Sequence, residues 1–100
     1  MKKFAMMLMN PLFDSEKHRA VFQTGNIENH IVTVRNENEA LEKAQVLVLE
    51  GFGVLEVCGA FEEELVQKML DTTEGKLCIG RVVYSSEQIE ALENYWSNEI

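Results

Sequence analysis

The chain of 100 residues is 46% hydrophobic and 26% charged, and its formal net charge is −8. This composition is typical of one globular domain over residues 1–100 with a single core, and it excludes a disordered chain. The acidic balance, with no basic cluster beyond Lys2 and Lys3, lacks the electrostatic footprint of a protein that binds nucleic acid or an anionic membrane.

The amino-terminal apolar run does not have the features of a signal peptide. Asn10 and Pro11 end it early, and no small-residue cleavage site follows. No segment is long enough to cross a bilayer. Cys58 and Cys78 form no C-x-x-C motif and lie in apolar runs, which is typical of reduced cysteines. We therefore expect a cytoplasmic protein with no membrane partner.

In chain order, the first predicted element is a strand over 4–9, where the apolar run is short and continuous. The segment 14–22 (DSEKHRAVF) then predicts a short helix. Residues 24–26 (TGN) have turn chemistry. The segment 30–35 (HIVTVR) is rich in β-branched residues and predicts the second strand.

The rest of the chain alternates helix and strand. Asn36 followed by Glu39 resembles a capping box, and apolar residues then recur at helical spacing until Gly51. A helix over 61–70 is stopped by Gly75. The remaining predicted elements are strands over 54–58 and 77–84 and a final helix with the apolar stripe Ile89, Leu92, Tyr95 and Trp96.

These elements follow the order β-α-β-α-β-α-β-α, which favours an α/β fold with a mainly parallel four-stranded sheet. Two arrangements are open. In one, helices cover both faces of a small flavodoxin-like sheet. In the other, all helices cover one face and the strands follow sequence order, as in half of a (βα)₈ barrel. The second leaves a sheet face bare and so requires self-association into a homodimer or higher oligomer.

Ligands of parallel α/β sheets bind beyond the carboxyl ends of the strands. Four stretches of this chain qualify: Asn10 to Phe13, the strand end at Arg35, Cys58 to Ala60, and Tyr84 to Ser85.

Glu56 is the most unusual residue of the predicted strands because it stands between Leu55 and Val57. A carboxylate buried there must be paired, hydrogen-bonded or protonated, and Arg81 in the neighbouring βα unit is a candidate partner. The functional interpretation is a general base or a group that binds substrate. The structural interpretation, which we favour, is an ion pair or an exposed position on an edge strand.

Cys58 ends a strand just before a helix, which is a position where a thiol can act as a nucleophile. Three glutamates at 62–64 oppose that effect, so a packing role is favoured. The same glutamates oppose phosphate binding, and Gly59 alone makes no glycine-rich nucleotide motif. His18 and His30 show no metal-ligand spacing, so we expect no metal and no cofactor.

The stretches FDSEKHRA (13–20), GFGVLEVCGAF (51–61) and GRVVY (80–84) resemble a family of short prokaryotic proteins that is catalogued as a domain of unknown function. The resemblance spans nearly the whole chain. It implies no known activity and no catalytic residues.

The segment 40–90 is similar to one βαβα portion of class I keto-deoxy-phosphogluconate aldolases, which are (βα)₈ barrels. The resemblance places Glu56 on the inner face, where the matching glutamate of those enzymes assists proton transfer. The arginine that follows it there is Ala60 here, and the glycine-rich strand is replaced by Ile79-Gly80-Arg81-Val82. The Schiff-base lysine lies on a later strand that this chain lacks. The resemblance therefore implies βα topology and not aldolase activity.

These observations favour a small-molecule binding domain that works as a homo-oligomer. Its site would lie at the carboxyl strand ends, with Glu56 as the candidate catalytic residue and Cys58, Arg81, Tyr84 and His18 as ligand contacts. One alternative is an isomerase or lyase that uses Glu56 as its general base. Another is a structural oligomerisation module that seals a Glu56–Arg81 pair in a subunit interface.

Overall fold

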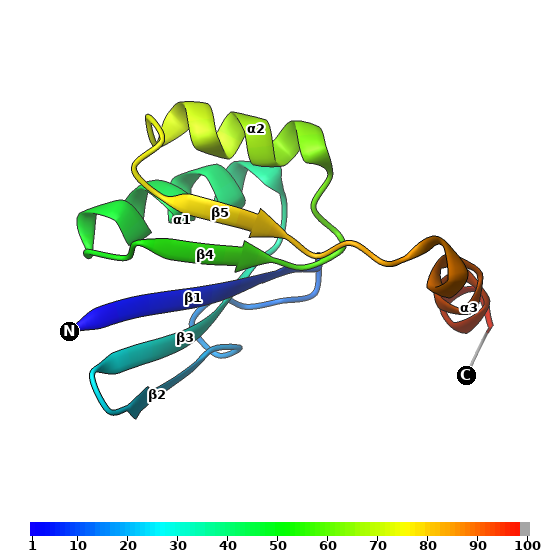
Figure 1. Cartoon of the computed structure of the whole chain (residues 1–100), viewed down its shortest axis with the longest axis horizontal. Coiled ribbons are helices and arrows are strands. Elements are labelled where there is room, and N and C mark those ends of the chain that lie inside the picture. Colours follow the sequence, from blue (N-terminus) through cyan, green and yellow to red (C-terminus); the bar gives the residue numbers. More distant parts are fainter. Residues whose placement is uncertain (99–100) are drawn as a thin grey trace.

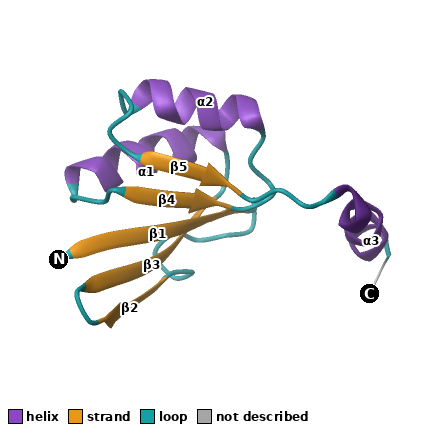
Figure 2. Cartoon of the chain, in the orientation of Figure 1, coloured by secondary structure: helices purple, strands orange, loops and turns teal. Residues whose placement is uncertain are grey.

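The computed structural model describes residues 1–98 of the chain. Its helices and strands are shown in Figure 2. The strands are β1 (Lys2–Met9), β2 (Ala20–Thr24), β3 (Ile27–Val34), β4 (Val54–Val57) and β5 (Cys78–Arg81). The helices are α1 (Glu37–Leu49), α2 (Glu63–Thr72) and α3 (Ser86–Ser97).

The strands form one sheet in the order β2-β3-β1-β4-β5. β1 is parallel to both β3 and β4, and β4 is parallel to β5, whereas β2 runs antiparallel to β3. The α/β class and the mainly parallel sheet are therefore confirmed. The half-barrel strand order is wrong, because β1 lies between β3 and β4 and the parallel strands do not follow sequence order.

The predicted helix over 14–22 is also wrong. In the structure, this segment begins with a single turn, in which the Asp14 carbonyl accepts the N–H of His18 at 2.8 Å. The chain then extends into β2. Phe22 and its neighbours favour a strand, and the turn at Gly25, whose φ is +60°, leads directly into β3. From Ala20 onward, pairing with β3 outweighs the short helical pattern, because the ladder of this pair supplies partners for backbone groups of β2.

α1 begins and ends close to the predicted positions. The Oδ1 of Asn36 accepts the Glu39 N–H at 2.9 Å, as expected of an N-cap. The second hydrogen bond of a capping box, from the N-cap N–H to the glutamate, is shifted by one residue. The Glu39 carboxylate accepts the N–H of Arg35 and not that of Asn36. The chain leaves the helix through Gly51, whose φ is +90°.

Two of the three helices cover the same face of the sheet, where α1 and α2 lie side by side (Figure 1). This face holds the core. Its strand residues Ala5, Met7, Val32, Val34, Leu55 and Val57 are buried against Ala40, Ala44 and Leu47 of α1, Phe61, and Leu65 and Met69 of α2. Helices on both faces, as in the flavodoxin-like arrangement, are therefore not observed in the described part of the chain.

The opposite side of the sheet, here called the helix-free face, is apolar but uncovered. Strand alternation and pairing place on it the apolar residues Phe4, Met6, Leu8, Phe22, Ile27, Ile31 and Val54, together with Lys2, Ala20, Thr24, Asn29, Thr33, Glu56, Cys78 and Gly80. Val54 is 42% exposed and Phe22 is 55% exposed, while Phe4, Met6 and Leu8 are half-buried by their neighbours.

α3 lies beyond the carboxyl ends of β4 and β5 and covers neither face of the sheet (Figure 1). No residue of this helix is buried. Trp96 is 75% exposed and Ile89 is 42% exposed, so the predicted apolar stripe is present but does not pack on the sheet. Among residues 1–98, no helix combines the length and the apolar character needed to cross a membrane.

Candidate functional site

An open cleft of about 820 Å³ lies at the carboxyl end of the sheet. Its floor is formed where the chain leaves three parallel strands, at Met9 and Asn10 after β1, at 58–60 after β4, and at 81–84 after β5. Its far wall is the α3 stripe of Ile89, Leu92 and Trp96. The volume falls in the range that holds a small organic molecule.

The position of the cleft follows from the strand order. The chain leaves β1 toward β2 and β3 on one side, and it leaves β4 toward α2 and β5 on the other side. Because these connections diverge, a crevice opens between the ends of two neighbouring parallel strands. Open α/β sheets bind their ligands at such topological switch points.

The cleft combines an apolar lining with one charged side chain. Among residues 1–98, Arg81 is the only charged residue that lines it, in a protein whose net charge is −8. Within residues 1–98 its guanidinium forms no ion pair with a carboxylate. Arg81 can therefore offer its full set of planar N–H donors to an anionic group in the cleft.

Two loop residues add polar groups to the floor. The Oδ1 of Asn10 accepts the N–H of Leu12 at 2.9 Å, which fixes this side chain to its own loop and leaves the NH₂ group as a donor. Cys58 is half-buried and carries a free thiol. Its N–H donates to the Met7 carbonyl at 3.1 Å, and its carbonyl accepts the Phe61 N–H at 3.1 Å. These bonds hold the turn after β4 in place.

Three of the residues predicted for the site meet in this cleft. Cys58, Arg81 and Tyr84 all line it, and they come from the ends of two adjacent strands. Their convergence is the consequence expected of parallel strands, whose carboxyl ends lie at one edge of a sheet. Within the described residues, no group of three His, Cys, Asp or Glu side chains could hold a metal ion together.

Glu56 does not belong to this group. It pairs with Gly80, whereas Arg81 pairs with Val57, so Glu56 and Arg81 point to opposite faces of the sheet. Glu56 is exposed on the helix-free face. The expected buried carboxylate and its ion pair with Arg81 are therefore wrong, because the helices cover only the face that carries Leu55 and Val57. The alternative, an exposed position on an edge strand, is right about the exposure but wrong about the strand, since β4 lies between β1 and β5.

His18 is also outside the lining of the cleft. Its Nδ1 accepts the N–H of Asp14 at 2.8 Å, and its ring lies 5.8 Å from the Phe13 ring. Its backbone carbonyl accepts the hydroxyl of the buried Thr33 at 2.8 Å. His18 therefore fastens the loop before β2 to β3, which is a structural role.

Several residues that line the cleft could not be recognised as site residues from the sequence. The residues Ile89, Leu92 and Trp96 had the spacing of a stripe that packs on a sheet. That spacing is the same whether the stripe meets a sheet or a ligand, so only the position of α3 in space distinguishes the two. Val83 lies in the predicted last strand, but the strand ends at Arg81 and the rest of the segment becomes a cleft wall.

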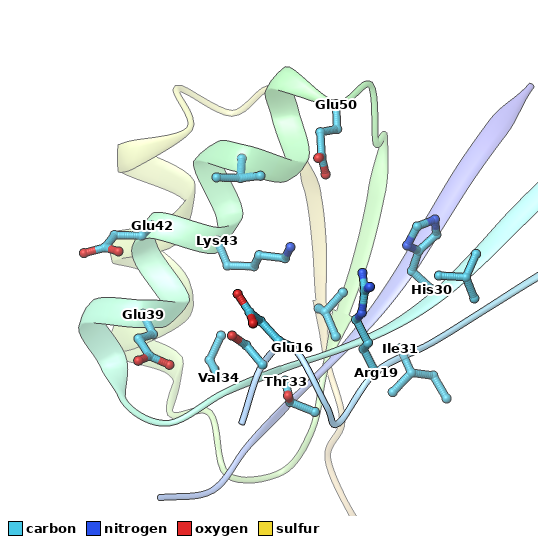
Figure 3. A pocket seen from close by; sticks show the side chains of 14 residues that line it. Glu16, Arg19, His30, Ile31, Thr33, Val34, Glu39, Glu42, Lys43 and Glu50 are labelled. Atoms are coloured by element: carbon cyan, nitrogen blue, oxygen red, sulfur yellow. The ribbon is translucent and has the colours of Figure 1, made fainter. Parts of the chain in front are cut away.

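A second cavity of about 740 Å³ lies between α1 and the β2–β3 hairpin (Figure 3). Its lining carries charges of both signs: Glu39, Glu42, Lys43 and Glu50 come from α1 and its end, and Glu16 and Arg19 come from the loop before β2 (Figure 3). At its edge the His30 Nε2 lies 2.7 Å from the Glu28 carboxylate. This hydrogen bond lowers the pKa of Glu28. Its four glutamates outnumber Arg19 and Lys43, so this cavity does not favour an anion. The cleft at the strand ends, with its single cation Arg81, is the stronger candidate.

Comparison with known proteins finds no significant match among curated proteins or among solved structures. A family model does match, and it covers residues 2–97. The chain therefore belongs to the family described as a family of unknown function (DUF6506).

Proposed function

We propose that the protein binds a small organic anion with an apolar or aromatic body in the cleft at the carboxyl strand ends. The observation that carries this proposal is the isolated Arg81 guanidinium in a lining whose other described residues are uncharged. A carboxylate or a similar planar anion matches the two parallel donors of a guanidinium. The apolar body would lie against Val83 and the α3 stripe.

The lining supports binding more than catalysis. Among the residues that the structure describes, Cys58 is the only strong nucleophile of the lining, and neither a histidine nor a carboxylate is present there to act as a general base. An isomerase or lyase that uses Glu56 would have to work on the helix-free face, away from Arg81. For this reason we propose a binding protein.

Trp96 makes the proposal directly testable, because it is the only tryptophan of the chain and it lines the cleft. We would titrate the full-length protein with 1-anilinonaphthalene-8-sulfonate, a probe with an anionic group and an aromatic body. Binding in the cleft would quench Trp96 emission by energy transfer while the probe fluorescence rises.

The decisive variant is Arg81→Gln, which removes the charge and keeps a polar side chain. We expect its affinity for the probe to fall about tenfold or more, as for the loss of a charge-assisted bond. Lys76→Gln is the matched control, since Lys76 is an exposed cation just before the other end of β5. Equal affinity of the wild-type protein and the Arg81→Gln variant would refute the proposal. As a separate measurement, native mass spectrometry of the freshly purified protein would identify any ligand that it retains.

A further inference from the structure

The helix-free face is an apolar surface that no helix within residues 1–98 covers. Its central residues Phe4, Met6 and Leu8 lie on the middle strand, and the exposed side chains of Ile31 and Val54 flank them. Soluble monomers seldom expose a contiguous apolar surface of this kind, since covering it is strongly favourable. α3 does not cover it (Figure 1).

We infer that the helix-free face packs against the same face of a second copy of the chain, which gives a two-fold symmetric homodimer with two sheets in contact. This inference is independent of the proposed ligand, because the cleft lies at the strand ends and not on this face. An isologous contact needs a surface that is complementary to itself, in size as well as in charge.

The size of the face fits a dimer interface. Five strands at a spacing of about 4.8 Å and a mean length of about 20 Å give a face on the order of 500 Å² in plan. The relief of the side chains increases the accessible area, which then approaches the roughly 800 Å² that each partner contributes to a standard interface. Two packed sheets also bury each other at a separation of about 10 Å, a distance that these side chains can fill.

The charges of the face fit a particular arrangement. Lys2 and Glu56 are the only charged residues that the five described strands place on it, and the pairing of Phe4 with Val54 and of Met6 with Glu56 fixes their levels. Lys2 lies two residues before Phe4, and Glu56 lies two residues after Val54. A two-fold axis that crosses the strands at the level of Phe4 and Val54 therefore brings Lys2 of each copy to the level of Glu56 of the other.

This arrangement explains why a carboxylate can stand in the middle of an apolar face. In the dimer, each Glu56 would be paired with Lys2 of the partner, so no charge would be buried without a partner. It also accounts for the alternation of Val54 and Glu56 with the buried Leu55 and Val57 along β4, because both faces of this strand would then contact protein.

Analytical ultracentrifugation of the full-length protein over a range of concentrations tests the inference. The wild-type protein should be a dimer. Val54→Glu should weaken dimerisation by more than tenfold, because it places two like charges across the axis. Val46→Glu is the matched control: Val46 is 40% exposed, against 42% for Val54, but lies on α1. This control should remain a dimer, and circular dichroism should show that both variants are folded.

A charge-reversal cycle tests the specific arrangement. Lys2→Glu and Glu56→Lys should each weaken the dimer, and the double variant should recover it. Three results would overturn the inference: a wild-type monomer at high concentration, a dimer that Val54→Glu leaves intact, or a double variant no better than the single ones. A dimer lost in an Ile89→Glu variant but kept in Val54→Glu would show instead that α3 is exchanged between copies.

Discussion

Arg35 and Glu39 close the junction between β3 and α1 through the two oxygens of one carboxylate. The guanidinium Nη2 lies 2.7 Å from Oε2, and the Nε donates to the same oxygen at 2.9 Å. The backbone N–H of Arg35 donates to Oε1 at 2.9 Å. The side-chain and backbone hydrogen bonds from Arg35 lower the pKa of Glu39, and the bond to Glu39 raises the pKa of Arg35.

The lowered pKa of Glu39 predicts a pH-dependent contribution to stability. A carboxyl whose pKa is lower in the folded state stabilises the fold above its ordinary pKa of 4.5 and loses that contribution as the pH falls through the lower folded value. Glu39→Gln should therefore reduce the free energy of unfolding at pH 7, and the two proteins should converge in acid. Urea unfolding at pH 7 and pH 3 measures this.

Glu42→Gln is the control for this measurement, since Glu42 lies on the same helix and is exposed. Because the Arg35–Glu39 pair is partly open to solvent, the difference should be modest and should shrink in high salt. A Glu39→Gln difference that is the same at both pH values would show that the carboxylate charge is not the cause.

Phe61 is the largest side chain that is completely buried, and it stands between β4 and α2. Phe61→Ala should lower the free energy of unfolding by about 3–5 kcal/mol, because it removes apolar contacts and leaves a cavity. Leu12→Ala is the control, since Leu12 is 87% exposed, and its effect should stay within about 0.5 kcal/mol. Urea unfolding followed by circular dichroism compares the two. Similar losses in both variants would mean that Phe61 is not part of a close-packed core.

Gly51 and Gly53 allow the effect of backbone conformation on stability to be measured without a steric clash of the added side chain. Gly51 has a φ of +90°, whereas Gly53 has no left-handed φ, and a Cβ at either position would meet open space. Gly51→Ala should destabilise the protein by about 1–2 kcal/mol because of its left-handed backbone. Gly53→Ala should instead stabilise it slightly, by about 0.4–1 kcal/mol, through the unfolded state. Thermal unfolding of both variants decides this, and a Gly51→Ala protein as stable as the wild type would contradict it.

The elements that could be predicted from the sequence are those with their own local signals. Asn36 and Gly51 mark the two ends of α1, and Gly75, with a φ of +69°, ends the turn after α2. β2 has a turn at its end but no signal at its start that separates it from a short helix, and its strand state depends on pairing with β3. Local patterns also could not predict that helices cover only one face of the sheet. Alternation assigns the side chains of a strand to two faces, but it does not show which face packs against helices.

The same limit explains the outcome for the site. Cys58, Arg81 and Tyr84 could be brought together from sequence because parallel strands end at one edge. The environment of Glu56 could not be predicted, because a polar residue within an apolar strand gives the same sequence pattern whether it faces a core, a partner or water. The far wall of the cleft depends on the direction in which the short segment 82–85 leads the chain to α3. This segment has no regular structure, so its sequence has no periodic pattern from which the position of α3 could be predicted.

α3 yields the last prediction. Because none of its residues is buried, a chain that ends at Tyr84 should keep its free energy of unfolding to within about 0.5 kcal/mol, measured by urea unfolding and circular dichroism. It should also keep the proposed dimer, since the helix-free face remains complete. It should lose most of its affinity for the anilinonaphthalene probe, because Ile89, Leu92 and Trp96 form the apolar wall of the cleft. A large loss of stability would contradict this, since it would mean that α3 packs on a protein surface, its own or that of a second copy.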